Sequence, residues 1–247
     1  MIRTAVLHHH FEAISLAVSA RSAHNATIKS CIKMEGIIMV QFDWQIVETA
    51  EYSHDTAPSF VTLTTRSYLT ITGQAADRTR DPEFQKRADV VKAVAEKISR
   101  GPDAGIMIDR YRSYRPYQLQ AVWSGGDTIE DRHTFKLWVK QPLFVKPEYA
   151  RQALTQLDLG ELGEQVAFEN LAEGTEIQSF SATPLTNTSQ AVQTLTDAVS
   201  ERGLKPLSTD SHREVYIDGY GPNVAVLLRY AIDPDTGQID EGRMAVN

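Results

Sequence analysis

The apolar residues of the chain follow first a strand period and then a helix period. Residues 60–73 (FVTLTTRSYLTITG) are rich in Thr, Val, Tyr and Ile, which favour a strand, and they end at a glycine. Residues 81–102 come next, and their apolar positions recur at helical spacing: Phe84, Ala88, Val91, Ala95 and Ile98. Asp81 is suited to cap this helix, Pro82 fits its first turn, and Gly101 with Pro102 ends it. The pattern predicts a strand followed by an amphipathic helix.

Two more strand segments complete this unit. Residues 117–123 (YQLQAVW) and 134–144 (TFKLWVKQPLF) are separated by a turn region at Gly125 and Gly126. The predicted order of elements is therefore β-α-β-β. A connecting helix that begins at Pro147 follows it.

The same order recurs in the second half of the chain. Residues 167–182 supply one or two strand segments, and a helix runs from Asn187, as its cap, to Gly203. Two strands, 212–218 and 223–232, follow and are joined by a tight GYGP turn. Because each helix is followed by a hairpin, the pattern excludes a doubly wound parallel sheet.

These patterns predict an α+β fold. Two β-α-β-β units, about 58–144 and 166–233, form a domain over residues 39–247, and their curved antiparallel sheets enclose a central ligand cleft. Residues 1–38 differ from the rest: they have no clean apolar face, and Met34 and Met39 are possible starts. We expect a disordered or mis-annotated leader there. Its three adjacent histidines, His8 to His10, cannot all bind one metal ion from one stretch of backbone.

Glu214 lies in a predicted strand although Glu suits a half-buried sheet surface poorly. Successive side chains of a strand point to opposite faces. If the helices cover the Val215 side, Glu214 faces away from the core, and the same parity places Gln120 beside it. We expect both residues to line the cleft, with these possible walls: Tyr216, Trp138, Gln178, Phe180 and Tyr68. The alternative is a solvated sheet face on which Glu214 forms an ordinary ion pair with Arg213 or Arg229.

Composition limits the possible partners. The chain has 247 residues, 42% of them hydrophobic, and a formal net charge of −7. The acidic balance argues against a general nucleic-acid binder, and no apolar run approaches the ~20 residues that span a bilayer. Cys31 is the only cysteine, so an intramolecular disulfide is excluded and a reducing, cytoplasmic setting is favoured.

Several short motifs resemble one family. The duplicated unit, YQLQAVW, KLWVKQPLFVKPEYARQAL, LAEGTEIQ and HREVYID are similar to the GyrI-like small-molecule-binding proteins, which are related to the effector-binding domains of AraC- and MerR-type regulators. The resemblance covers about residues 41–233. It implies a cleft at the pseudo-twofold axis, in which a carboxylate between aromatic rings receives lipophilic, often cationic, compounds. Glu214 and Tyr216 match the family pattern H-H-E-I-Y.

The resemblance also implies possible functions. The first is a stand-alone binder of hydrophobic, cationic or planar molecules, in which Glu214 is the anchor, Tyr216 and Trp138 are walls and Gln120 is a neutral hydrogen-bonding partner. The second is a hydrolase of strained, cyclopropane-type electrophiles that uses Glu214 and Tyr216 as catalytic residues. The third is a gyrase-inhibitor-like interaction protein. Four departures from the family pattern weaken the hydrolase hypothesis: Gln120 for Glu, Ser124 for Trp, Ser181 for His and Leu185 for Tyr.

Other candidate motifs do not fit their patterns. Residues 233–240 (DPDTGQID) lack the ligands that complete a calcium loop. Residues 109–117 (DRYRSYRPY) interleave Arg and Tyr as in a single-strand nucleic-acid site, but an arginine-rich loop that leads into the hairpin fits the acidic chain better. No nucleophile elbow, phosphate loop or dinucleotide fingerprint occurs, so neither a cofactor nor a metal is expected.

Overall fold

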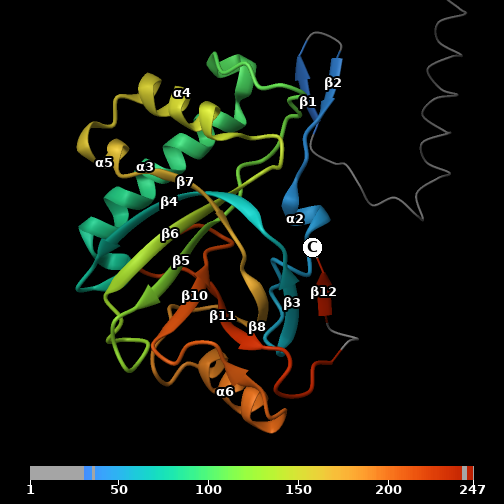
Figure 1. Ribbon diagram of the computed structural model, residues 1–247, viewed down its shortest axis with the longest axis vertical. Coiled ribbons are helices and arrows are strands. Elements are labelled where there is room, and N and C mark those ends of the chain that lie inside the picture. Colours follow the sequence, from blue (N-terminus) through green and yellow to red (C-terminus); the bar gives the residue numbers. More distant parts are fainter. Residues whose placement is uncertain (1–30, 35–36, 241–243, 247) are drawn as a thin grey trace, which may run out of the picture.

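A computed structural model describes residues 31–34, 37–240 and 244–246. The described chain is α+β, and its largest element is a curved, unclosed sheet that is antiparallel except at one edge (Figure 1). The strand order is β12-β3-β8-β11-β10-β5-β6-β4-β7, and the short strand β9 (Lys205–Pro206) pairs with β11. A separate hairpin consists of β1 (Cys31–Met34) and β2 (Ile37–Val40).

The predicted duplication is present. The first unit consists of β4 (Arg66–Gln74), α3 (Pro82–Ser99), β5 (Leu119–Ser124) and β6 (Thr134–Gln141). The second consists of β8 (Gly174–Ser181), α6 (Gln190–Glu201), β10 (Ser211–Val215) and β11 (Val226–Asp233). The two units join where β5 pairs with β10, so the order β4-β6-β5 in one unit mirrors β8-β11-β10 in the other.

The two units exchange their outer strands. The segment predicted as one strand at 60–73 is divided into β3 (Ser59–Leu63) and β4, and β3 pairs with β8 of the second unit. In the same way β7 (Ala167–Leu171) precedes β8 but pairs with β4 of the first unit. The breaks fall at Thr64-Thr65 and Ala172-Glu173. This exchange ties the two units together through backbone hydrogen bonds at both ends of the sheet.

The two long helices pack on the sheet and form the core. α3 contacts β4 and β6, and α6 contacts β8 and β11. Asp81 caps α3 by accepting from the Glu83 amide, and every residue of its predicted apolar stripe is buried. We call the sheet face under α3 the helix face. α4 (Pro147–Leu157) and α5 (Gly160–Glu164) connect the units, and α4 begins at Pro147 as predicted.

An irregular segment crosses the other face of the sheet. It covers residues 41–58, includes the single turn α2 (Trp44–Val47), and is called the strap below. Trp44 is fully buried and donates its indole N–H to the Pro116 carbonyl. The carbonyls of Ala50 and Glu51 accept hydrogen bonds from Gln178 and Arg229 of the sheet. The strap lies on the open side of the curve in Figure 1.

Two local predictions need comment. Ser189, rather than Asn187, occupies the cap position of α6, because the Asn187 side chain and amide bond the backbone and carboxylate of Glu130. Most of the expected leader lies outside the described residues, which within it include only β1 and the first two residues of β2. The helices that the structure describes are all too short or too polar to cross a membrane.

Candidate functional site

The side chains of β10 point to the opposite faces of the sheet from those predicted. Glu214 pairs with Ala121 on β5 and Leu228 on β11, whereas Gln120 lies opposite Val215. Directly opposed residues share a face, so Glu214 is on the helix face and Gln120 is on the other. The expectation that both residues face one cleft is therefore wrong. Residue type could not reveal this parity, because His212 to Ile217 are all buried, polar and apolar residues alike, so no alternation between a polar and an apolar face marks a solvent side.

Glu214 is fully engaged by neighbouring donors. One carboxylate oxygen pairs with Arg78 and accepts from His212 Nε2 at 2.9 Å, and the other accepts from the Tyr216 hydroxyl at 2.7 Å. The Tyr216 oxygen in turn accepts from the Trp123 indole at 3.1 Å. Burial opposes ionisation, but the attraction of Arg78 and the bonds from His212 and Tyr216 outweigh it and lower the pKa of Glu214 to about 2.

The same network fixes the protonation of His212. Arg132 lies 2.7 Å from His212 Nδ1, and a guanidinium can only donate, so Nδ1 accepts and the ring proton is on Nε2, facing Glu214. Burial lowers the pKa of His212, despite the adjacent Glu214 carboxylate. His212 is a neutral structural bridge with no free nitrogen for proton transfer.

Arg78 occupies the position that the sequence predicted for a cationic ligand. Its guanidinium pairs with Glu214 and lies 4.6 Å from the centre of the Trp123 ring, which stacks on Phe84 of α3. The remaining cavity, lined in part by Leu185 and Tyr216, is about 30 Å³, which is room for little more than a water molecule. The predicted carboxylate between aromatic rings is present, but the Arg78 side chain occupies the space that was expected for a ligand.

The other predicted site residues lie on the opposite face. Tyr68, Gln120, Trp138 and Gln178 surround Arg213 and Arg229, and Phe180 packs on His54 at the edge. Arg213 bonds Glu176 at 3.0 Å and lies 3.4 Å from Glu173, while Arg229 lies 3.5 and 3.6 Å from these two carboxylates. The strap covers this ionic cluster, so the structure gathers these residues into a core network.

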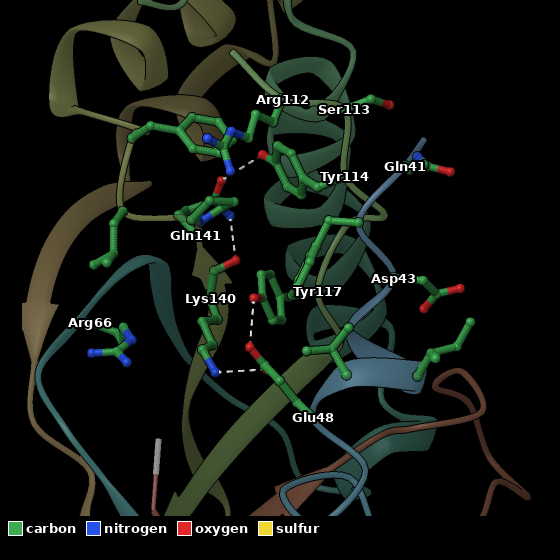
Figure 2. Close-up of a pocket in the computed structure, with 16 residues that line it drawn as sticks. Gln41, Asp43, Glu48, Arg66, Arg112, Ser113, Tyr114, Tyr117, Lys140 and Gln141 are labelled. Carbon is green, nitrogen blue, oxygen red and sulfur yellow. Dashed lines mark hydrogen bonds and ion pairs between the residues drawn. The ribbon is translucent and has the colours of Figure 1, made fainter. Parts of the chain in front are cut away.

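A larger cavity lies beside that network, between the strap, residues 112–117 and the end of β6 (Figure 2). We call it the strap pocket. Its volume is about 530 Å³, within the range of small-molecule sites. Four aromatic residues contribute to its wall: Phe42, Tyr114, Tyr117 and Phe144. None of the seven site residues predicted from the sequence lines it.

A group of charged side chains in direct contact with one another lies at the floor of the strap pocket. Lys140 is buried between Glu48, at 3.1 Å, and Glu51, at 2.8 Å, and the Tyr117 hydroxyl donates to Glu48 at 3.0 Å (Figure 2). Burial raises the pKa of Glu48, Lys140 lowers it, and Glu51 raises it again, with a net increase. Glu48 is thus a carboxyl with an upward-shifted pKa at the base of an aromatic cavity, which is a property of acid–base groups.

Three apolar side chains of the strap pocket are exposed to solvent. Ile46, Val47 and Leu143 line the pocket and are 39%, 45% and 75% exposed. Among the described residues only two other large apolar side chains are as exposed, Met107 and Leu207. Sequence reasoning missed this site because the strap belongs to neither repeat. The interleaved Arg and Tyr residues of 109–117 were the available signal, since Arg112, Tyr114 and Tyr117 all line the cavity.

In the described part of the chain, no three metal-ligating side chains come together in an arrangement that could hold an ion. The strap pocket itself offers aromatic rings, a buried carboxyl–ammonium set and arginines.

The fold and the two networks define an α+β protein with a duplicated β-α-β-β core. It is similar to the crystal structure of a hydrolase from Listeria innocua, with a TM-score of 0.66, 18% identity, and coverage of 77% of this chain and 99% of that chain. An uncharacterized conserved protein from the same organism gives a TM-score of 0.66 at 19% identity, over 77% and 99% of the two chains. At these identities the likeness concerns the fold. No family model matches the chain, and no curated protein matches it either.

Proposed function

We propose that the chain contains a GyrI-like domain that binds a hydrophobic, planar small molecule in the strap pocket. One observation carries the proposal: three of the five exposed large apolar side chains of the described residues line one aromatic-walled cavity of about 530 Å³. Exposed apolar groups that cluster around a concavity are typical of ligand sites. The sequence resemblance to small-molecule-binding proteins supports the same function.

A neutral fluorescent dye tests this proposal. Nile red should bind the full-length protein saturably with one site. The double variant Ile46→Ser with Leu143→Ser should weaken binding by roughly thirtyfold, because each side chain contributes about 1 kcal/mol of apolar burial when a ligand covers it. Both residues are substantially exposed, so folding should be unaffected. The matched control, Met107→Ser with Leu207→Ser, removes the other two exposed apolar side chains and should leave the affinity within twofold. Equal affinity for both double variants contradicts the proposal.

A second candidate function is hydrolysis, and the position of Glu48 favours it. This carboxyl is 12% exposed at the floor of the pocket, its pKa is raised, and it is oriented by Tyr117 and Lys140. Such a group can pass a proton to or from a bound substrate. Glu214 is less suited as a base, because a carboxylate with a pKa of about 2 accepts protons weakly.

Variants at the two carboxylates separate these possibilities. Activated esters and strained cyclopropane electrophiles serve as substrates, and Glu48→Gln should reduce turnover at least 100-fold if Glu48 is the acid–base group. Full turnover in Glu48→Gln with loss in Glu214→Gln would instead support the role that the sequence resemblance implies for Glu214. Saturable dye binding without turnover of any substrate supports a binding protein.

A further inference from the structure

Two arginines of the strap pocket lack an acidic partner among the described residues. Arg66, at the start of β4, donates to the Thr64 hydroxyl and the Thr65 carbonyl, and no carboxylate lies within 4.0 Å of it. Arg112 is exposed at the pocket and forms no ion pair in the described part of the chain. Figure 2 shows the two side chains at different ends of the lining, Arg66 at the end of Lys140 and Arg112 at the end of Tyr114.

The acidic groups of the lining are already engaged. Asp43 accepts from the Gln45 amide at 3.0 Å, where it caps α2, and it lies 3.4 Å from Arg115. Glu48 accepts from Lys140 and Tyr117. The lining thus has two acidic side chains, each with a donor, and three basic ones, of which only Lys140 has acidic partners. The unbalanced charge of the pocket is positive, in a chain whose net charge is −7.

The position of the charges gives a ligand its orientation. At the floor, Glu48 and Glu51 share one ammonium group, so an anion there meets two carboxylates. Away from this floor, Arg66 and Arg112 each offer guanidinium donors suited to carboxylate or sulfonate oxygens. An apolar body fits the aromatic wall.

We infer that the strap pocket takes a planar aromatic molecule with one acidic group, which Arg66 or Arg112 binds while the rings lie against the aromatic residues Tyr114, Tyr117 and Phe144. This inference rests on the proposed function. It reverses the charge expected from the resemblance, which implied a cationic ligand for Glu214. That carboxylate is paired with Arg78 and lies outside this pocket.

Three probes with the same ring system test the inference. 2-Naphthoate, 2-naphthylmethanol and 2-naphthylmethylamine carry a negative, a neutral and a positive group, and each is titrated against the full-length protein with bound Nile red. Naphthoate should displace the dye at a concentration roughly tenfold lower than the amine. The preference should shrink as salt rises from 20 to 500 mM, because exposed charges are screened.

Variants at the two arginines test whether these residues cause the preference for naphthoate. Arg66→Gln with Arg112→Gln should abolish the advantage of naphthoate and leave the affinity for the alcohol within twofold, and Arg66→Lys with Arg112→Lys should retain most of it. Arg110→Gln, in the same loop but outside the lining, is the matched control and should change nothing. Preference for the amine, or an unchanged preference in the double Gln variant, overturns the inference. Failure of Nile red itself to respond to Ile46→Ser with Leu143→Ser is a different result, which refutes the pocket and not its charge preference.

Discussion

Gln120 lies opposite Val215 in the β5–β10 ladder, and Ala121 is the residue that faces Glu214. Gln120 and Glu214 therefore point to opposite faces of the sheet. Glu214 belongs to a network with Arg78, His212 and Tyr216 on the helix face, and Gln120 belongs to the arginine cluster under the strap. The join between the two repeats holds two separate polar networks, one on each face, instead of one shared cleft.

The Glu214 network should make stability depend on acid pH. The pKa of Glu214 falls from 4.5 to about 2 on folding, so the folded state favours the ionised carboxylate. Its stabilisation is complete above about pH 4.5 and is lost as the pH falls toward 2. The shift corresponds to about 3 kcal/mol. Urea unfolding at pH 7, 4 and 3 measures it.

The variant Glu214→Gln should be less stable at pH 7 and should lose this part of the pH dependence, because no group then titrates at that position. Glu161→Gln, at an exposed carboxyl on α5, is the control and should follow the wild-type curve. If Glu214→Gln and the wild-type protein lose stability in parallel between pH 4.5 and 2, the lowered pKa of Glu214 is not the cause of the acid sensitivity.

The order of elements could be predicted from the sequence because each has a clear period or cap. The apolar stripe from Phe84 to Ile98 and the cap at Asp81 define α3 well. The division of residues 60–73 into β3 and β4 could not be predicted, since Thr64 and Thr65 continue the β-branched pattern through the break.

The faces to which the side chains of β10 point could not be predicted from the sequence, for a different reason. Strand parity is deduced from one face being polar, but Arg213 and Glu214 are adjacent in β10 and both are buried in ion pairs. The charged residues therefore do not indicate which face of β10 points to solvent. Glu214 and Tyr216 are two residues apart, so their side chains lie on one face and belong to one buried site, as the sequence indicates. Their partner Arg78 comes from a loop, and no local sequence pattern connects it to them.

His212 should remain neutral over an unusually wide pH range. Its pKa is lowered from 6.5 by burial, so its contribution to stability is present above pH 6.5 and decreases as the pH falls below that value. Nitrogen-15 NMR of the imidazole should show a neutral ring with the proton on Nε2 at pH 7. In Arg132→Met the pKa of His212 should rise, because a positive neighbour and the donor to Nδ1 are both removed. A proton on Nδ1, or a charged ring at pH 6.5, contradicts the proposed tautomer.

The arginine cluster should be sensitive to the loss of one member. Arg229 is fully buried and lies between Glu173 and Glu176, so Arg229→Met leaves two carboxylates with Arg213 as their remaining cation. We expect a loss of about 3–5 kcal/mol in the free energy of unfolding. Arg110→Met, at an exposed arginine, should cost less than about 0.5 kcal/mol.

A second substitution in the same cluster distinguishes a charge effect from a packing effect. Adding Glu176→Gln to Arg229→Met removes one of the unpaired carboxylates, so the double variant should be more stable than the sum of the two single changes indicates. A coupling energy near zero in this double-mutant cycle would show that Arg229 contributes through its packing volume and not through its charge.

The strap pocket should depend on Trp44, although this residue does not line it. Trp44 is fully buried, packs on Tyr52 with ring centres 4.6 Å apart, and fixes α2 through its bond to Pro116. Trp44→Ala should therefore cost about 3–5 kcal/mol and release the wall of the pocket that Ile46, Val47 and Glu48 form. Nile red binding should be lost under conditions in which circular dichroism still shows a folded sheet.

The milder variant Trp44→Phe separates anchoring from general destabilisation. It keeps a ring against Tyr52 and removes only the indole N–H, so the cost should be about 1 kcal/mol and the dye affinity should stay within twofold. Hydrogen exchange should show that Trp44→Ala raises exchange in residues 41–58 far more than in β5 and β10, because the strap opens as a unit while the sheet remains paired. If the Ala variant exchanges faster in the strap but binds Nile red as tightly as the wild-type protein, the strap is not a wall of the binding site, and the ligand must bind elsewhere on the molecule.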